Sequence, residues 1–231
     1  MRRLVFDLET ISKDFDSLDE TSKAMLEMRF KRYATTPEEI EEEKSKLTFS
    51  PLTAEIVAIG MLDADTDRGA CYFQAPGGHD DFESGGVKYE PGDERTILQK
   101  FWHAAAFYDE FITFAGRTFD APMLLIRSAI LGIRPSKNLM TNRYLESQPS
   151  GLRHIDLQDQ LSFYGAKRDP LGLHFWTSAF DIPSPKTGAI TGDDITRVFR
   201  NGAYREIAEY CMGDVTATRA LFRKWETYLR L

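Results

Sequence analysis

Five side chains that carry carboxylate or phenol groups fall at the ends of predicted elements or on one face of the last predicted helix, where they could share one site. Asp7 and Glu9 close a short apolar strand, and residues two apart on a strand point to the same face. Asp120 stands at the start of a predicted helix that follows another strand. Tyr210 and Asp214 lie four residues apart on the last predicted helix, so they share one face of it.

Four carboxylates that converge would repel one another, and some would take up protons unless a cation joined them. Carboxylate oxygens without a cluster of histidines or cysteines suit Mg²⁺ or Mn²⁺. Two such ions about 4 Å apart support displacement at a phosphodiester, because one activates water and the other stabilises the leaving oxygen. Each residue alone also has an ordinary structural explanation, such as a helix cap or a position at the rim of the core. Only the combined set indicates phosphodiester chemistry.

Three segments around these residues resemble the motifs of a known family. They are DLET at Asp7–Thr10, FAGRTFDAP at Phe114–Pro122 and YCMGD at Tyr210–Asp214. They resemble the three motifs of the DEDD, or DnaQ-like, 3′–5′ exonucleases, and the tyrosine four residues before the last aspartate is typical of the DEDDy branch. The chain looks most like the proofreading exonuclease domain of family B DNA polymerases and its stand-alone bacterial relatives. The resemblance implies an RNase H-like fold.

The resemblance also implies a role for each residue. Asp7 resembles the aspartate that bridges two metal ions, and Glu9 and Asp214 resemble ligands of the ion beside the attacking water. Asp120 resembles a ligand that holds the second ion largely through water. Tyr210 resembles the tyrosine that orients the attacking water, and with an ordinary pKa near 10 its phenol stays protonated. The implied cofactor is two Mg²⁺ or Mn²⁺ ions per site.

Four further residues within the first two motifs are candidates for substrate contacts. They are Thr10, Gly116, Arg117 and Phe119. By resemblance, Phe119 packs beside a terminal base or sugar, although a simple core position suits a phenylalanine equally well. The family usually has an asparagine before the glycine of the second motif, whereas this chain has Ala115. This difference leaves the metal site intact and puts the grip on substrate in question.

Two residues near the fifth predicted strand are secondary candidates. Asp156 lies inside an apolar segment beside the expected site, where it either supports the metals or is a buried, hydrogen-bonded aspartate. His154 precedes it, and a lone histidine is more often structural. The four histidines of the chain are scattered and show no metal-ligand spacing.

Apolar periodicity predicts an α/β chain with a mixed sheet of about five strands flanked by helices. The predicted strands are Arg3–Leu8, Ala54–Asp63, Ala70–Gln74, Phe111–Ala115 and Leu152–Leu157. The second and third are expected to pair antiparallel across the turn at Asp65–Gly69. The predicted helices are Glu94–Phe107, Phe119–Leu131, Leu171–Phe180, Gly192–Arg200 and Ala203–Leu229.

We expect a single domain over residues 1–231 with two additions to the sheet and its helices. Residues 12–50 are rich in charge and favour helix, with Pro37 at a helix start, so we predict a helical insertion there. Residues 76–92 hold five glycines and two prolines, and we predict an exposed, mobile loop.

The net charge of −7 over 231 residues argues at first against a nucleic-acid substrate. The charge is uneven, however, because residues 1–120 carry a net −11 and residues 121–231 a net +4. Basic residues in predicted loops of the second half could meet phosphates, namely Arg143, Arg153, Lys167, Arg168 and Lys186. The acidic balance therefore does not exclude a nucleic-acid partner, and the resemblance implies one bound at a single-stranded 3′ end, with DNA favoured.

The remaining composition indicates a soluble, cytoplasmic protein without a membrane partner. Cys71 and Cys211 make no disulfide framework, and no apolar region of a signal peptide follows the first two arginines. The longest apolar stretch, Ile56–Leu62, is far too short to cross a bilayer.

The combined interpretation is a 3′–5′ exonuclease that releases nucleoside 5′-monophosphates by a two-metal mechanism. One alternative is a Mg²⁺-dependent aspartyl phosphatase, since DLET superficially resembles its nucleophile motif. That chemistry usually has an aspartate where Glu9 stands and another where Thr218 stands. The second alternative is a non-catalytic nucleic-acid-binding module on the same fold.

Overall fold

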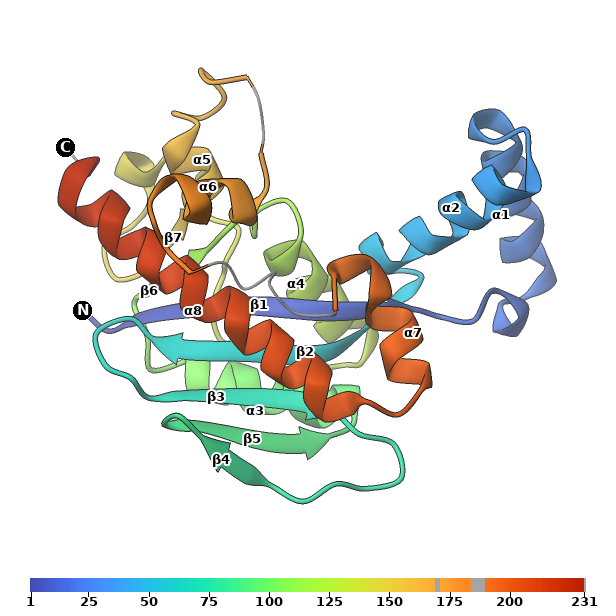
Figure 1. The fold of residues 1–231 in the computed structure, drawn as a ribbon, viewed down its shortest axis with the longest axis horizontal. Helices are drawn as coiled ribbons and strands as arrows, with labels where there is room; N and C mark the ends of the chain where they lie inside the picture. The colour runs from blue at the N-terminus through green and yellow to red at the C-terminus, as the bar shows by residue number, and fades with distance from the viewer. Residues whose placement is uncertain (169–170, 184–189, 231) are drawn as a thin grey trace.

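The computed structural model describes residues 1–168, 171–183 and 190–230. At its centre lies a seven-stranded sheet with the order β4-β5-β3-β2-β1-β6-β7 (Figure 1). The strands are β1 (Arg3–Ser12), β2 (Ala54–Asp63), β3 (Gly69–Gln74), β4 (Phe82–Ser84), β5 (Val87–Gly92), β6 (Glu110–Thr113) and β7 (Arg153–Asp156). The mixed α/β fold is confirmed, and β2 and β3 pair antiparallel as expected. The sheet has two strands more than the five predicted.

The two additional strands lie in the segment for which we predicted a mobile loop. β5 pairs parallel with β3, and β4 pairs antiparallel with β5. Residues 87–90 alternate between apolar and polar side chains, and Val87 and Tyr89 are buried. The glycines and prolines around this short alternation concealed it. The loop prediction was therefore wrong for residues 82–84 and 87–92.

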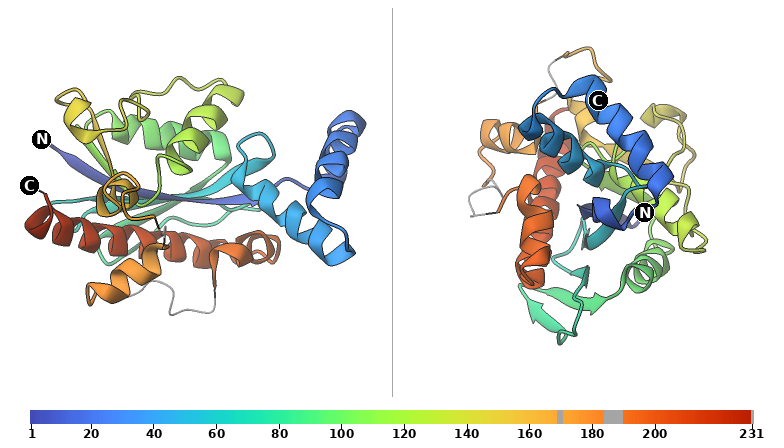
Figure 2. Two further views of the ribbon diagram at one scale, coloured as in Figure 1. Left: turned by 90° about the horizontal axis from the view of Figure 1, so that it is seen from above. Right: turned by 90° about the vertical axis from the view of Figure 1, so that its right-hand side faces the viewer.

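Helices cover both faces of the sheet (Figure 2). Buried side chains of α3 and α4 form one core with the sheet, and those of α5–α8 form a second core on the other face. The helices are α1 (Glu20–Tyr33), α2 (Pro37–Ser45), α3 (Glu94–Ala105), α4 (Asp120–Ile130), α5 (Leu157–Leu161), α6 (Leu173–Ala179), α7 (Ile195–Arg200) and α8 (Tyr204–Tyr228). None of the helices within the described residues combines the length and apolar character that crossing a membrane requires.

The predicted helical insertion forms α1 and α2, which extend beyond one end of the sheet (Figures 1 and 2). Pro37 is the first residue of α2, and Thr36 and Glu39 form a capping box around that helix start. The insertion is tied to β1 by two hydrogen bonds. The Thr10 hydroxyl donates to the Thr48 carbonyl oxygen at 2.9 Å, and the Thr48 hydroxyl donates to the Thr10 carbonyl oxygen at 3.0 Å.

Side chains alternate across β1 and separate the two cores. Leu4, Phe6 and Leu8 pack with α3 and α4, whereas Val5 packs on the face covered by α8. The same alternation directs Asp7 and Glu9 toward α8.

Helix α8 packs closely against the sheet at Gly60 of β2, which pairs with Asp7 of β1. A Cβ atom on Gly60 would lie 2.8 Å from Val215 Cγ2 and 3.0 Å from Cys211 Sγ. Both separations are shorter than carbon and sulfur atoms tolerate, so a glycine is required for this packing. Cys211 consequently lies directly over the sheet, where its thiol donates to the Asp7 carbonyl oxygen at 3.5 Å.

His154 of β7 is buried and connects the edge of the sheet to a loop. Its Nδ1 lies 3.0 Å from the Leu139 carbonyl oxygen, and because a carbonyl only accepts, Nδ1 carries the proton. Nε2 then accepts from the Thr113 hydroxyl at 2.8 Å. Burial lowers the pKa of His154 to about 4, so the ring is neutral at physiological pH.

This buried neutral ring predicts a loss of stability in mild acid. The unfolded chain binds a proton at His154 near pH 6.5, whereas the folded chain does so only near pH 4. The contribution of His154 to the free energy of unfolding is therefore complete above pH 6.5. It declines by at most about 3 kcal/mol as the pH falls toward 4. Urea unfolding of the wild type and of His154→Gln between pH 7 and pH 4 measures it. A difference between the two free energies that does not change with pH would contradict the prediction.

The contact at Gly60 predicts a steric cost for any side chain there. Gly60→Ala is expected to lower the free energy of unfolding by about 1–3 kcal/mol, because α8 must move away from the sheet. Gly172→Ala is the matched control, since a Cβ there meets no atom within 4 Å and φ is −69°. Urea unfolding of both variants tests this, and equal stabilities would refute the close packing.

Candidate active site

Asp7 and Glu9 lie side by side on the face of β1 that α8 covers. One oxygen of each carboxylate and the Sγ atom of Cys211 all lie within 4.8 Å of one another. Tyr210 is one residue before Cys211 on α8. Burial raises the pKa of the Tyr210 phenol well above its usual value, and so do the charges of Asp214, Glu9 and Asp7. These three carboxylates therefore lie within electrostatic range of the phenol.

Asp120 reaches the same region from the start of α4. Its side chain is buried, with 3% of the residue exposed. Burial raises its pKa to about 8, and the charges of Asp156 and Asp214 act in the same direction. Backbone hydrogen bonds from Asp120 itself and from Leu8 of β1 oppose that rise. The fourth carboxylate thus lies close to the backbone of β1 at Leu8 and within electrostatic range of Asp214 on α8.

The chemistry of these donors fits a hard divalent cation. The Oδ1 atom of Asp120 is buried and has no hydrogen-bond partner among the described residues, so a cation there would compensate its burial. Cys211 is the one soft donor in the group with Asp7 and Glu9. A hydrogen bond with Cys71 and burial raise the pKa of the Cys211 thiol, which keeps it protonated. The carboxylates are therefore suited to Mg²⁺ or Mn²⁺.

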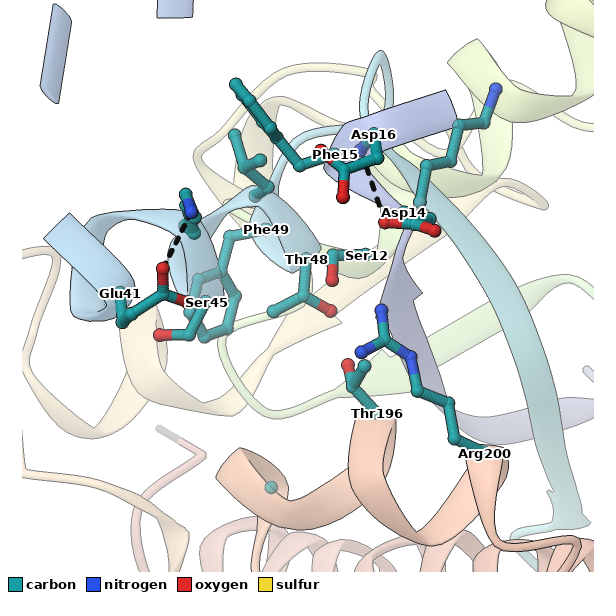
Figure 3. Close-up of a pocket in the computed structure, with 14 residues that line it drawn as sticks. Ser12, Asp14, Phe15, Asp16, Glu41, Ser45, Thr48, Phe49, Thr196 and Arg200 are labelled. Atoms are coloured by element: carbon teal, nitrogen blue, oxygen red, sulfur yellow. Dashed lines mark hydrogen bonds and ion pairs between the residues drawn. The ribbon is translucent and has the colours of Figure 1, made fainter. Parts of the chain in front are cut away.

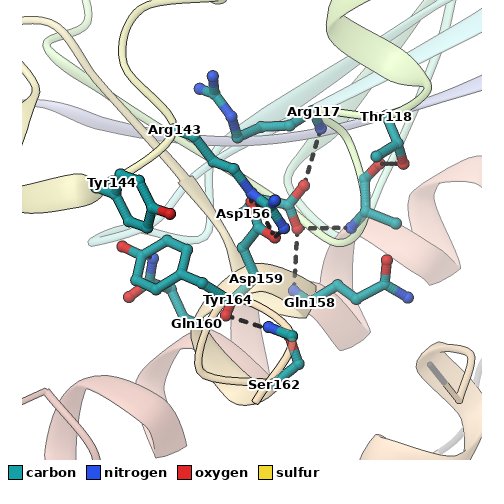
Figure 4. Close-up of polar contacts among 12 residues, drawn as sticks. Arg117, Thr118, Arg143, Tyr144, Asp156, Gln158, Asp159, Gln160, Ser162 and Tyr164 are labelled. Carbon is teal, nitrogen blue, oxygen red and sulfur yellow. Dashed lines mark hydrogen bonds and ion pairs between the residues drawn. The ribbon is translucent and has the colours of Figure 1, made fainter. Parts of the chain in front are cut away.

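Asp156 organises the loop that leads to Asp120. Its carboxylate accepts hydrogen bonds from the backbone N–H groups of Ala115 and Arg117, both at 2.9 Å, and of Gln158 at 3.0 Å (Figure 4). The last of these caps α5. Of the two interpretations of Asp156, these contacts favour the buried, hydrogen-bonded aspartate. The ring of His154 on β7 lies beside Phe6 of β1, on the face of the sheet opposite α8.

The loop of the second motif has two positions with steric requirements. Ala115 adopts φ 61°, in the left-handed region that asparagine tolerates better than alanine. A Cβ atom on Gly116 would lie 2.4 Å from the Thr113 hydroxyl oxygen, so only glycine fits. Gly116 therefore has a packing role, and its contact with substrate stays a prediction. The asparagine that the family usually has at position 115 suits this backbone geometry as well as substrate contact.

The other predicted substrate contacts are already engaged within the protein. The Thr10 hydroxyl donates a hydrogen bond to the Thr48 carbonyl oxygen in the insertion, and the Arg117 guanidinium donates to the Thr141 carbonyl oxygen at 2.7 Å. Phe119 is half-buried, and its ring lies edge-on to Phe49 with 5.9 Å between centroids. Substrate contact by these residues remains a prediction.

Two of the basic residues expected to meet phosphates form ion pairs instead. Arg143 pairs with Asp159, and Arg153 lies 3.5 Å from Glu110. Lys186 lies outside the described residues. The charge of these loops is thus partly neutralised within the protein.

Residues 52–229 match a family described as "Predicted 3'-5' exonuclease related to the exonuclease domain of PolB". The matched range includes Asp120, Tyr210 and Asp214, whereas Asp7 and Glu9 precede it. Among curated proteins, none matches the chain.

A solved structure similar to this one is the family B DNA polymerase from the hyperthermophilic archaeon Pyrobaculum calidifontis. The TM-score is 0.61 at 16% identity, over 97% of this chain and 24% of the polymerase chain. The chain thus spans about a quarter of the length of that polymerase, and at this identity the likeness concerns the fold, which is RNase H-like. Because the family match covers most of the sequence, the chain belongs to the family of predicted 3′–5′ exonucleases related to the exonuclease domain of PolB.

Proposed function

We propose that the protein is a metal-dependent 3′–5′ exonuclease that hydrolyses single-stranded ends and releases nucleoside 5′-monophosphates, with DNA preferred to RNA. The observation that carries this proposal is the close approach of Asp7 and Glu9 on β1 to Cys211 of α8, all within 4.8 Å of one another, because α8 also carries Tyr210 and Asp214. Exonucleases of the family are typically metal-dependent, and a nuclease family implies a nucleic-acid substrate.

Four carboxylates would hold two Mg²⁺ or Mn²⁺ ions, and they come from three elements. Asp7 and Glu9 belong to β1, Asp120 to α4 and Asp214 to α8. Bound divalent ions supply Lewis-acid activation of water and stabilise charge on the leaving oxygen. The protein contributes a fixed arrangement of these carboxylates, because β1 is packed between α8 and the α3–α4 layer.

Tyr210 acts as a hydrogen-bonding group in this proposal and not as a base. Burial and three neighbouring carboxylates raise the pKa of its phenol, so the hydroxyl proton is retained at physiological pH. A protonated phenol orients the attacking water or a phosphate oxygen beside Glu9 and Asp214.

An aspartyl phosphatase is less well supported by the same residues. Phosphatases of that kind usually have a second aspartate shortly after the one that corresponds to Asp214, and this chain has Thr218 there. Thr218 is buried in α8, with 1% of the residue exposed, and faces the core. A buried threonine there supplies no carboxylate. The absence of a covalent aspartyl-phosphate after incubation with a phosphate analogue would separate the two chemistries.

The proposed metal site predicts that removal of a single carboxylate abolishes most of the nuclease activity. Asp7→Asn and Asp214→Asn are each expected to slow degradation of a 5′-labelled single-stranded DNA by more than about 100-fold in Mn²⁺. Chelation by EDTA is expected to abolish the wild-type ladder of products. Asp81→Asn is the matched control, because Asp81 is an exposed aspartate in the connection before β4.

Two outcomes would contradict this assignment. Full activity of Asp7→Asn or Asp214→Asn would reject the site. Calorimetry that detects no Mn²⁺ binding to the wild type would favour the non-catalytic nucleic-acid-binding module.

The role of Tyr210 predicts a different pattern for its substitution. Tyr210→Phe removes the hydroxyl and keeps the ring, so activity is expected to fall about 10- to 100-fold while Mn²⁺ affinity in calorimetry changes little. An equal loss of Mn²⁺ affinity would indicate that Tyr210 supports the metal ligands and does not orient water.

A further inference from the structure

The root of the helical insertion faces α7 across a groove of about 360 Å³. Figure 3 shows Arg200 and Thr196 projecting from α7 toward Ser12, Asp14 and Thr48 on the opposite wall. The groove thus joins three segments that are distant in the sequence: the end of β1, the last part of the insertion, and α7.

The groove lies near the candidate active site. Ser12 follows Glu9 by three residues on the extended strand β1, a distance of about 10 Å. Phe49 lines the groove, and its ring lies edge-on to Phe119 of the second motif. Phe49 is 60% exposed, so part of its ring remains accessible to a base. A strand whose 3′ end lies at the carboxylates would reach this groove within a few nucleotides.

The guanidinium of Arg200 is available for a ligand. It forms no ion pair within the parts of the chain that the structure describes, although Asp14 and Asp16 line the same groove. The other acid of the groove, Glu41, pairs with Lys44 at 2.6 Å. A planar guanidinium with five donors matches the oxygens of a phosphate.

We propose that the groove between the insertion and α7 binds the backbone of the substrate strand upstream of its 3′ end, with Arg200 contacting a phosphate. This inference rests on the proposed nuclease function. Hydroxyl groups of Ser12 and Thr196 lie on the two walls and offer further donors to the same phosphate. Asp14 and Asp16 repel other phosphates, so the contact is local and the groove is not a broad basic surface.

Binding measurements without turnover test the proposal. Anisotropy of a labelled single-stranded decadeoxynucleotide in Ca²⁺ is expected to show about tenfold weaker binding by Arg200→Ala than by the wild type. The slope of log affinity against log salt is expected to fall by about one, and a dinucleotide is expected to lose much less affinity.

The control is Arg197→Ala on the same helix. Arg197 is exposed, pairs with Asp194 at 2.7 Å and does not line the groove, so its removal is expected to leave affinity and salt slope at wild-type values. Equal affinities and slopes for Arg200→Ala and Arg197→Ala would overturn the proposal, as would a wild type that does not bind the decanucleotide.

The two proposals fail in different ways. A wild type that binds the decanucleotide through Arg200 but does not cleave it in Mn²⁺ supports the groove and rejects the nuclease. A wild type that cleaves, with an affinity that Arg200→Ala leaves unchanged, rejects the groove and keeps the nuclease.

Discussion

The approach of α8 to the sheet at Gly60 fixes the geometry of the candidate site. β1 carries Asp7 and Glu9, and α8 carries Tyr210 and Asp214, so the spacing between strand and helix decides whether these groups meet. Asp7 pairs with Gly60 in the antiparallel register, so the close contact between the sheet and α8 lies next to the first carboxylate. A helix held farther away by a side chain would separate the phenol from the acids that now raise its pKa.

The same packing makes ionisation of the site carboxylates unfavourable unless a positive charge lies beside them. Carboxylates near one another in a partly buried region favour proton uptake, and Asp120 shows this most clearly because burial raises its pKa to about 8. The backbone N–H group of Leu8 offsets only part of that cost. Divalent cations would favour the ionised forms, so stability of the site and its proposed chemistry depend on the same ions. A net charge of −7 is therefore compatible with a phosphodiester substrate.

Sequence patterns predicted the elements whose periodicity is long, and missed those that depend on distant partners. The apolar runs of β1 and β2 and the amphipathic α8 were recognisable alone, whereas β4 and β5 are short and surrounded by glycine and proline. Asp156 was ambiguous because its partners at 115 and 117 lie about 40 residues earlier. Gly60 is recognisable from the sequence, since a glycine inside an apolar strand indicates close approach of another element.

The insertion changes the surroundings of the site without changing its carboxylates. Two reciprocal hydrogen bonds between Thr10 and Thr48 anchor it immediately after Glu9 and connect its root to the first motif. Lys46 pairs with Glu42 and Glu43 of the acidic run on α2, at 3.1 and 2.7 Å, which reduces the repulsion that this run would exert on a nucleic acid. The groove wall opposite Arg200 carries the hydroxyl groups of Ser12 and Thr48 as well as Asp14 and Asp16, so the proposed phosphate contact is confined to the part of the groove beside Arg200.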